Sequence, residues 1–181
     1  MAYWQLQQHR HVKCQFQKAM SPEILLQIIW NALNKVPDPE IPVVSLVEMG
    51  IVRDVRLFPN GVEITMTPTF SGCPALKVMA DDIETKLREI GFAQVRINTT
   101  LSPPWTSDWI TDAARAKLKA FGLAPPARHG GNIQVIFFDP VACPYCDSPN
   151  TSIKNSFGST LCRAIYYCHD CRQPFEQFKP L

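Results

Sequence analysis

Two Cys-x-x-Cys motifs near the carboxyl end constrain the fold of this chain more than any other feature: Cys143 with Cys146, and Cys168 with Cys171. Each motif lets two thiolates from one tight turn reach the same ion, and two such turns facing each other form a tetrahedral sulfur site. Between the motifs, SIKNSF and RAIYYC can pair as strands across a turn at residues 157–160. The motifs then lie at the base of a hairpin, and the pattern predicts a zinc ribbon.

The cysteine-rich tail has too few apolar residues to build a hydrophobic core of its own. Structural zinc contributes on the order of 10–16 kcal/mol of apparent binding free energy in finger peptides, which is enough to fold so short a segment. A site of four thiolates could instead hold iron or an iron–sulfur cluster, because thiolates suit both. The closed set of four ligands favours structural zinc.

A fifth cysteine, Cys162, lies between the two motifs. Free cysteines are often small buried residues, so Cys162 is either a packing residue of the second ribbon strand or an accessory thiol beside the metal. His169, inside the second motif, could replace a cysteine as a ligand, although four thiols already complete the site and favour a turn residue without a metal bond. Both questions stay open from the sequence.

The composition is that of a globular protein, with 181 residues of which 46% are hydrophobic and 19% are charged. This length allows one ordinary domain and one small domain. No apolar run approaches the roughly 20 residues that a bilayer crossing needs, so we expect no membrane partner. The first 20 residues lack the apolar stretch of a secretory signal, and we expect a disordered tail or an extension ahead of a start at Met20.

Cysteine usage and charge narrow the compartment and the partners. Seven cysteines, arranged in metal-type pairs without an export signal, indicate a reducing compartment, and we expect a cytoplasmic protein. Residues 21–100 carry 7 Lys or Arg against 10 Asp or Glu, and residues 143–181 carry 4 against 3. Neither part concentrates the basic residues with which a nucleic-acid binder neutralises phosphates, so we expect no nucleic-acid partner.

Residues 21–100 predict the order α-β-β-α-β. Ser21 and Pro22 form a helix start, and the prolines of VPDPEIP end that helix. IVRDVRL and VEITMT are typical of a hairpin, a second helix follows Pro74 and closes at Gly91, and AQVRINTT supplies a third strand. The fold class is therefore α+β, with helices on a mixed sheet, followed by the four-cysteine zinc ribbon.

A segment rich in proline and tryptophan connects these two parts. Proline pairs flank a short helix that Ser107 or Asp108 could cap and Gly122 could end. NIQVIFF, at residues 132–138, predicts a strand that leads into the ribbon. The expected organisation is a tail at 1–20, an α/β domain at 21–100, a connector at 101–131 and the ribbon at 132–181.

Outside the ribbon, three residues are candidates for metal or thiol chemistry. Cys73 immediately precedes Pro74, at a predicted helix N-terminus where unpaired amides and the helix dipole stabilise a thiolate. The alternative for Cys73 is a buried thiol in a tight turn. Asp38 and Glu40 lie in the rigid turn DPEIP; carboxylates in such turns are usually solvated, but two acids there could coordinate a metal or present a docking edge.

The run DPEIPVVSLVEMGIVRDV, followed by EITMTPTFSGCPA, resembles the small α/β domain of SufT-like and cytosolic iron–sulfur assembly factors. These factors have an acidic Asp-Pro-Glu turn, a strand pair and a Thr-x-x-Gly-Cys-Pro loop, which corresponds here to residues 69–74. The resemblance covers residues 21–100. It implies that Cys73 takes part in iron–sulfur chemistry and that Asp38 and Glu40 belong to the signature turn of the family.

The rest of the chain resembles a more particular family. SPPWTSDWIT, GLAPP and the terminal FGSTLCRAIYYCHDCRQPFEQFKP are similar to the PaaD family of phenylacetate-degradation proteins, which are components of the bacterial phenylacetyl-CoA ring epoxidase system. The resemblance spans about residues 20–181 and includes Cys162, in the phrase Phe-Gly-Ser-Thr-x-Cys. It implies an accessory factor whose partners are the other epoxidase components, above all the iron–sulfur reductase component.

The residues agree with an accessory role and not with an enzyme. The Glu-x-x-His helices of a di-iron oxygenase are absent from the sequence, and so are the dinucleotide and P-loop fingerprints. We therefore expect a maturation factor with structural zinc in the ribbon and a transient iron–sulfur cluster or iron at Cys73. In this hypothesis Asp38 and Glu40 shape the site, and Cys162 assists transfer.

Two other classes of function stay open. In the first, a docking module without metal transfer contacts epoxidase components through the ribbon and through Trp105 and Trp109, although burial of these tryptophans between the two domains is the alternative. In the second, a thiol oxidoreductase uses Cys73 or the CPYC motif, which lacks the surrounding βαβ pattern. A homodimer is also compatible with the sequence.

Overall fold

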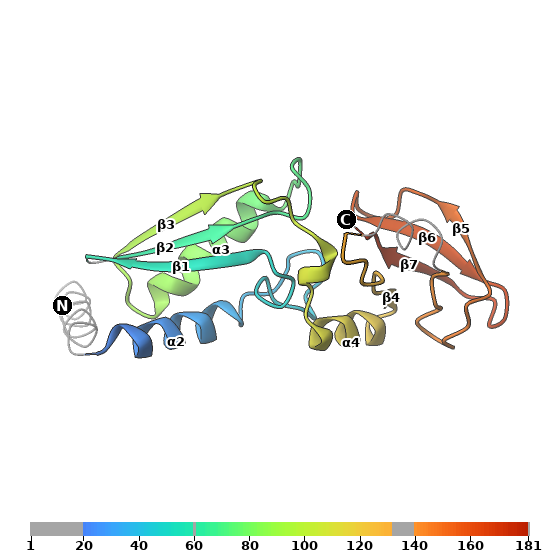
Figure 1. Ribbon diagram of the computed structural model, residues 1–181, viewed down its shortest axis with the longest axis horizontal. Helices are drawn as coiled ribbons and strands as arrows, with labels where there is room; N and C mark the ends of the chain where they lie inside the picture. Colours follow the sequence, from blue (N-terminus) through green and yellow to red (C-terminus); the bar gives the residue numbers. More distant parts are fainter. Residues whose placement is uncertain (1–19, 60, 132–139, 181) are drawn as a thin grey trace, which may run out of the picture.

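The computed structural model describes residues 20–59, 61–131 and 140–180, and it shows two sheets toward opposite ends of an elongated molecule (Figure 1). The predicted N-terminal tail and the predicted strand at 132–138 lie outside these described residues. Among the described residues, no helix is both long and apolar enough to cross a bilayer.

The first helix, α2 (Pro22–Leu33), begins where the sequence predicts. Ser21 Oγ accepts a hydrogen bond from the amide of Ile24 at 3.5 Å, and Pro22 occupies the first turn, where its missing N–H costs nothing. The helix buries Ile29, Ala32 and Leu33 against the sheet and the second helix. The chain then turns through the proline-rich segment that carries Asp38 and Glu40.

The N-terminal sheet has the mixed pairing that the sequence predicts. β1 (Val52–Phe58) and β2 (Gly61–Met66) form an antiparallel hairpin, and β3 (Gln94–Thr99) lies parallel to β2, in the order β1-β2-β3. The parallel pair requires a crossover, which α3 (Leu76–Glu89) provides. The order α-β-β-α-β is confirmed.

The second helix starts later than predicted but ends where expected. α3 begins at Leu76 with Ala75 as N-cap, because the residues from Ser71 to Ala75 form turns ahead of the first helical residue. Its buried face, Met79, Ile83 and Leu87, has the helical spacing expected of it. Gly91 follows the helix with a φ of 106°, a left-handed conformation that suits glycine after a C-cap.

The connector contains two short helices where one was predicted. η1 (Ser107–Trp109) is a single 3₁₀ turn, and α4 (Asp112–Ala120) follows with Thr111 as N-cap; Thr111 Oγ1 accepts from the amide of Ala114 at 3.1 Å. The predicted caps at Ser107 and Asp108 are therefore wrong for α4. The extended backbone at Ile110, with ψ of 125°, separates the two helices.

The ribbon sheet has two strands more than the predicted hairpin. β5 (Thr151–Asn155) and β6 (Arg163–Cys168) pair antiparallel as expected, and β7 (Pro174–Phe178) extends the sheet on the other side of β6. β4 (Leu123–Ala124) from the connector pairs parallel with β7, in the order β4-β7-β6-β5. The connector is therefore a part of the ribbon sheet as well as a spacer.

One hydrophobic core continues from the N-terminal sheet to the ribbon. Phe178 of β7 and Leu123 of β4 belong to the same buried cluster as Ile29 of α2 and Ile64 of β2. The second buried cluster is small: Ala124, Cys143, Cys168 and Phe175. The ribbon thus has little core of its own and relies on its metal-type cysteines and on contacts with the rest of the chain.

Candidate functional site

The four motif cysteines converge at the end of the ribbon sheet. Cys143 Sγ lies 3.6 Å from Cys171 Sγ, and Cys146 Sγ lies 3.6 Å from Cys168 Sγ. All four sulfurs lie within 4.8 Å of one another. Tetrahedral zinc–sulfur bonds of about 2.3 Å place sulfurs roughly 3.8 Å apart, so the group fits a tetrahedral thiolate site.

Local turns present these thiols without help from distant elements. The amide of Cys143 donates to Ser148 O at 2.9 Å, and the amide of Cys168 donates to Gln173 O at 3.0 Å, which closes each motif on itself. The residue after each second cysteine, Asp147 or Arg172, has a φ of 60°. A backbone amide hydrogen bond from Cys171 is the largest influence that lowers the pKa of Cys168, to about 7, which favours the metal-binding thiolate.

His169 lies outside the sulfur group. Its ring Nε2 is 3.0 Å from Ser152 Oγ, and its amide donates to Asn150 O at 2.9 Å. The side chain is exposed, and among the described residues the four cysteines form the candidate metal group without it. The interpretation of His169 as a turn residue agrees with this placement.

Cys162 does not lie beside the four thiols. It precedes β6, whereas Cys168 ends that strand, and six residues of strand separate them by roughly 20 Å at about 3.3 Å per residue. The alternative of an extra ligand at the ribbon metal is therefore wrong. Cys162 faces a different cavity, at the junction between the ribbon and the N-terminal sheet.

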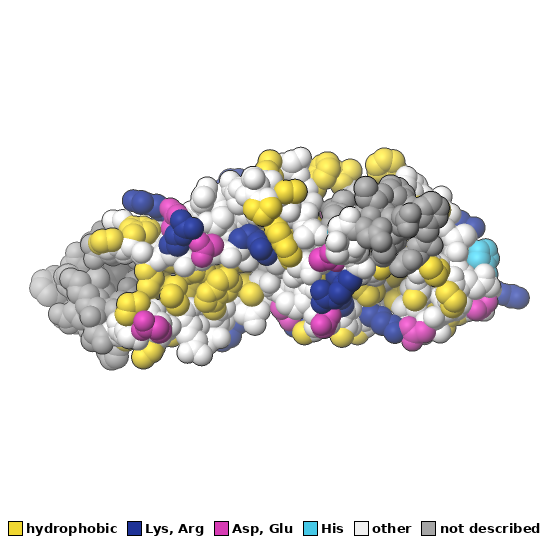
Figure 2. Space-filling view, viewed as in Figure 1, with side chains coloured by type: hydrophobic (Ala, Val, Ile, Leu, Met, Phe, Trp, Pro, Cys, Tyr) yellow, Lys and Arg dark blue, Asp and Glu magenta, His cyan; other side chains and the backbone are white. Residues whose placement is uncertain are grey.

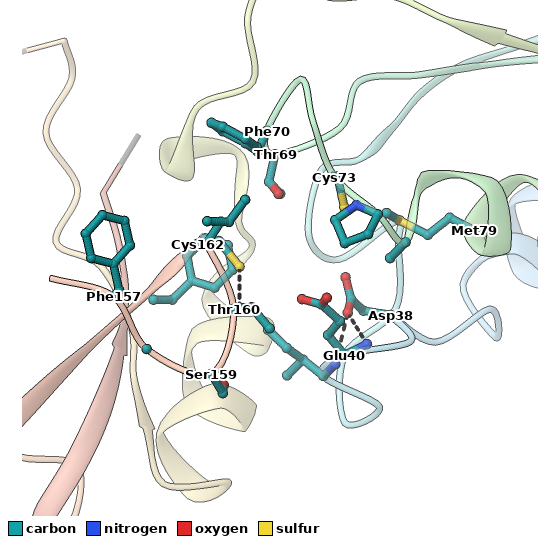
Figure 3. Close-up of a pocket in the computed structure, with 16 residues that line it drawn as sticks. Asp38, Glu40, Thr69, Phe70, Cys73, Met79, Phe157, Ser159, Thr160 and Cys162 are labelled. Atoms are coloured by element: carbon teal, nitrogen blue, oxygen red, sulfur yellow. Dashed lines mark hydrogen bonds between the residues drawn. The ribbon is translucent and has the colours of Figure 1, made fainter. Parts of the chain in front are cut away.

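This junction cavity has a volume of about 300 Å³ and collects the other sequence candidates (Figure 3). Cys73, Asp38 and Glu40 line it from the N-terminal part, and the turn between β5 and β6 lines it from the ribbon. The remaining lining residues that carry the argument below are Phe70, Phe157, Thr160, Leu161 and Cys162. The structure thus brings together three predicted site residues and adds Cys162.

Asp38 is a buried carboxylate and not a solvated turn residue. Its Oδ1 accepts hydrogen bonds from the amides of Glu40 at 2.8 Å and Ile41 at 2.9 Å, which fixes the acidic turn. Burial is the largest influence on this group and raises its pKa, against the opposing effects of the two amides and the Arg163 charge. In Figure 3 the other carboxylate oxygen points toward Cys73.

Arg163 joins the acidic turn to the ribbon. Its Nη2 donates to the backbone oxygen of Glu40 at 2.8 Å, while Nη1 donates to Glu176 at 3.0 Å and to Ser159 at 3.2 Å. The guanidinium is largely buried, with 10% of the side chain exposed. Sequence reasoning missed this residue; the available signal was a single arginine in the otherwise uncharged strand RAIYYC.

Cys73 lies near the start of α3, but its environment is the reverse of the one predicted. Amides of Ala75 and Leu76 lower the pKa of the thiol, yet burial and the charges of Glu40 and Asp38 outweigh them and raise it. The expectation of a stabilised thiolate is wrong for the empty cavity, because desolvation and negative neighbours both disfavour a second negative charge.

Cys162 shares this electrostatic environment. Burial is the main influence that raises the pKa of its thiol, and the charges of Glu40 and Asp38 act in the same direction. Its Sγ lies 3.0 Å from Thr160 Oγ1. Both junction thiols therefore lie in the field of the same two carboxylates.

The tryptophans of the connector have unequal surroundings. Trp105 is 5% exposed, its Nε1 donates to Met49 O at 3.0 Å, and its ring centroid lies 5.8 Å from that of Phe178. Trp109 is half-buried beneath the Arg53 guanidinium. The structure thus places Trp105 in the alternative position, buried between the two sheets, where it offers almost no surface to a partner.

Charged side chains do not merge into a single basic stripe on the face shown in Figure 2. Lysine and arginine side chains there lie beside acidic ones, with apolar side chains between them. This distribution provides no continuous positive surface on that face.

Comparisons with known families match both parts of the chain. Residues 26–99 match the family described as iron-sulfur cluster assembly protein, and residues 138–179 match the PaaD zinc beta ribbon domain. An iron–sulfur assembly domain joined to a zinc ribbon is the class that this fold and its thiol groups define.

Individual relatives agree with both matches. The chain is 42% identical over 151 residues to a protein of Escherichia coli (strain K12), a component of the system named "Putative 1,2-phenylacetyl-CoA epoxidase", covering 83% of this chain and 90% of that one. It is 34% identical over 98 residues to the Fe-S protein maturation auxiliary factor YitW of Bacillus subtilis, covering 53% and 95%. The chain belongs to the PaaD family.

A solved structure supports the fold of the N-terminal part. The crystal structure of a domain of unknown function, DUF59, from Bacillus anthracis has a TM-score of 0.51 and 31% sequence identity, and it covers 55% of this chain and 96% of that chain. The α/β part is therefore a DUF59-like domain.

Proposed function

We propose that this protein is an accessory maturation factor for the phenylacetyl-CoA ring-epoxidase complex of aerobic phenylacetate catabolism. It aids assembly of an iron–sulfur or iron centre in a partner protein, with the iron–sulfur reductase component as the client. It has no catalytic constellation of its own in this proposal. The relatives named as an epoxidase component and as Fe-S maturation auxiliary factors support this combination of partner and role.

The observation that carries the proposal is the convergence of Cys73 with Asp38 and Glu40 at one cavity. These residues lie within the segment that matches the iron–sulfur assembly family. A half-buried thiol between two carboxylates is suited to bind iron weakly, because the empty site disfavours the thiolate and a cation would restore it. Weak binding is what transfer to a client requires.

The four ribbon cysteines have a separate role in this proposal. Cys143, Cys146, Cys168 and Cys171 hold structural zinc, because they form a closed group of four sulfurs with no position left for a substrate. Zinc would fold the ribbon and so fix the ribbon side of the junction cavity.

The test compares the client made beside the native chain with the client made beside Cys73→Ser. We expect the reductase purified with the variant to contain less iron and sulfide per chain. Ser71→Ala, an exposed position in the same loop, is the matched control and should leave the client fully loaded. A fully loaded client beside Cys73→Ser would reject the proposal, provided that the variant retains its zinc and its circular dichroism spectrum.

A docking module without metal transfer is the second candidate, because apolar side chains surround the mouth of the cavity. Phe70, Phe157 and Leu161 line the cavity and are 45%, 62% and 52% exposed. Large exposed side chains at the rim of one cavity are typical of a protein interface. If Phe157→Asp abolishes co-purification with the epoxidase components while Cys73→Ser leaves the client loaded, this second function is the correct one.

A further inference from the structure

We propose that Cys162 and Cys73 together bind one thiophilic divalent cation in the junction cavity, with the Glu40 carboxylate as a third ligand. This inference rests on the proposed function and deepens it: the cargo is Fe²⁺, and the ribbon supplies half of the site. The ribbon is then more than a structural appendage of the iron–sulfur assembly domain.

The geometry places one thiol on each side of the cavity. Cys73 comes from the loop before α3, and Cys162 comes from the turn that leads into β6. Figure 3 shows the Glu40 carboxylate in the space between these two residues, with Asp38 behind it beside Cys73. An ion in the cavity would therefore meet sulfur from both parts of the chain and oxygen from the acidic turn.

A direct contact holds the two parts of the site in register. Arg163, the residue after Cys162, donates to the backbone oxygen of Glu40 at 2.8 Å. The guanidinium thus ties the proposed ribbon ligand to the proposed carboxylate ligand. Because the remaining arginine contacts are to Glu176 and Ser159 of the ribbon, this residue acts as a positioning group and leaves the Glu40 carboxylate available.

The chemistry of the lining selects a cation over an anion. Its polar side chains are two thiols, two carboxylates and the hydroxyls of Thr69, Ser159 and Thr160. Thiolates with a carboxylate suit a borderline divalent metal such as Fe²⁺ better than the hard ions Mg²⁺ and Ca²⁺. Binding forms two iron–sulfur bonds and releases the two thiol protons to solvent, with no change of oxidation state.

Cobalt is the probe, because its bonds to thiolates give a near-ultraviolet charge-transfer band. The full chain, purified anaerobically with zinc in the ribbon, is titrated with Co²⁺ while released zinc is measured. We expect one Co²⁺ to bind per chain, with a thiolate band and without zinc release. A chain that binds no Co²⁺ while its zinc stays in place would overturn the inference.

Cysteine variants test whether both thiols bind the same ion. Cys73→Ser and Cys162→Ser should each lower the Co²⁺ affinity by more than about 10-fold and weaken the charge-transfer band. Cys162→Ser combined with Ser156→Cys keeps the number of thiols but places one on an exposed position of the same turn, and it should behave like Cys162→Ser. Zinc content and Cys162→Ala guard against misfolding of a single variant.

The carboxylate variant separates ligands by type. Glu40→Gln should lower the affinity but keep the thiolate band, whereas Glu63→Gln, a carboxylate on β2 that does not line the cavity, should change neither. If Cys162→Ser binds Co²⁺ with native affinity and band while Cys73→Ser does not, the two-part site is wrong and the proposed function still stands. A fully loaded client beside Cys73→Ser would instead reject the proposed function, whatever the cobalt titration shows.

Discussion

The molecule has two thiol sites that differ in how they are built. In the ribbon, four sulfurs lie within 4.8 Å of one another, and short turns next to each cysteine hold them there. At the junction, Cys73 and Cys162 reach one cavity only because the ribbon packs against the N-terminal sheet. The first site is local and closed, and the second is tertiary and open.

This difference suits different tasks. A closed site with four sulfurs retains its ion and stabilises the fold, while an open site with few ligands can exchange its ion. The junction site also depends on the ribbon site, because the turn that carries Cys162 belongs to the ribbon sheet. The predictions below test this one-way dependence.

The largest expected effect follows loss of one ribbon thiol. Cys143→Ser should lose its metal and unfold the ribbon, because structural zinc contributes on the order of 10–16 kcal/mol in finger peptides, as much as a whole domain commonly has. Hydrogen exchange should show loss of protection at residues 140–180, with α2 and α3 still protected.

The control for this variant is Cys73→Ser, which should keep one zinc per chain and a protected ribbon. The comparison between the two sites breaks down if Cys143→Ser retains a protected ribbon without metal. In that case packing of Phe178 and Leu123 against the main core would suffice to fold the ribbon.

The second effect, in order of size, should disturb the junction and spare the ribbon. Arg163→Ala removes the bonds to Glu40 and Glu176 from a largely buried guanidinium, and we expect a loss of about 2–4 kcal/mol of unfolding free energy. Denaturant unfolding measures the loss, and the zinc content should not change.

A matched control for that loss is Arg56→Ala. Arg56 pairs with Asp54 on the surface, with 73% and 45% of the side chains exposed, so its removal should cost less than about 1 kcal/mol. Equal losses from the two variants would show that Arg163 does not hold the junction.

The two sites also differ in what the sequence alone can predict. The four ribbon cysteines can be identified together because they lie in two short motifs, and local spacing determines local geometry. The cavity cannot be identified in this way, because its walls come from segments far apart in the chain, and only packing brings Cys162 to Cys73. The missed strands have the same cause: β4 has two residues and forms only by pairing with β7.

The remaining errors come from energies that a local pattern cannot balance. The helix start beside Cys73 is a sound signal for a low thiol pKa, and amides of Ala75 and Leu76 do act in that direction. Burial and two carboxylates, neither of which is close to Cys73 in sequence, reverse the outcome. The same limit applies to Asp38, whose burial depends on tertiary packing.

A smaller effect is expected for Trp105→Phe at the packing contact between the sheets. The change removes the hydrogen bond from the indole to Met49 O and leaves a buried carbonyl unpaired, which costs about 1–3 kcal/mol. Urea unfolding measures this loss. Trp109→Phe, at the half-buried ring beneath Arg53, should cost less than about 1 kcal/mol, and the reverse order would mean that Trp105 does not anchor the junction.

The smallest effect concerns the pH dependence that Asp38 contributes. Burial raises the pKa of this carboxyl in the folded chain above its unfolded value of about 3.9. The folded state then holds the proton more tightly than the unfolded state. The stability contributed by Asp38 is therefore complete below a pH of about 3.9 and is lost as the pH rises through the folded pKa.

Asp38→Asn keeps the acceptor for the amides of Glu40 and Ile41 but removes the titration. The unfolding free energy of the native chain, minus that of this variant, should fall as the pH rises from about 3.9 and then level off. A difference that rises with pH would mean that the amides and Arg163 outweigh burial at this carboxylate. Glu63→Gln provides the control for general charge effects.

This pH dependence also tests the contrast between the two thiol sites. A buried carboxylate that lowers stability at neutral pH is reasonable in a cavity that takes up a cation, because the cation compensates its charge. Added Co²⁺ should therefore stabilise the native chain at about pH 7 more than it stabilises Asp38→Asn, as measured by thermal unfolding with zinc in the ribbon. Equal stabilisation would place the ion away from the acidic turn and leave the ribbon as the single metal site of the described chain.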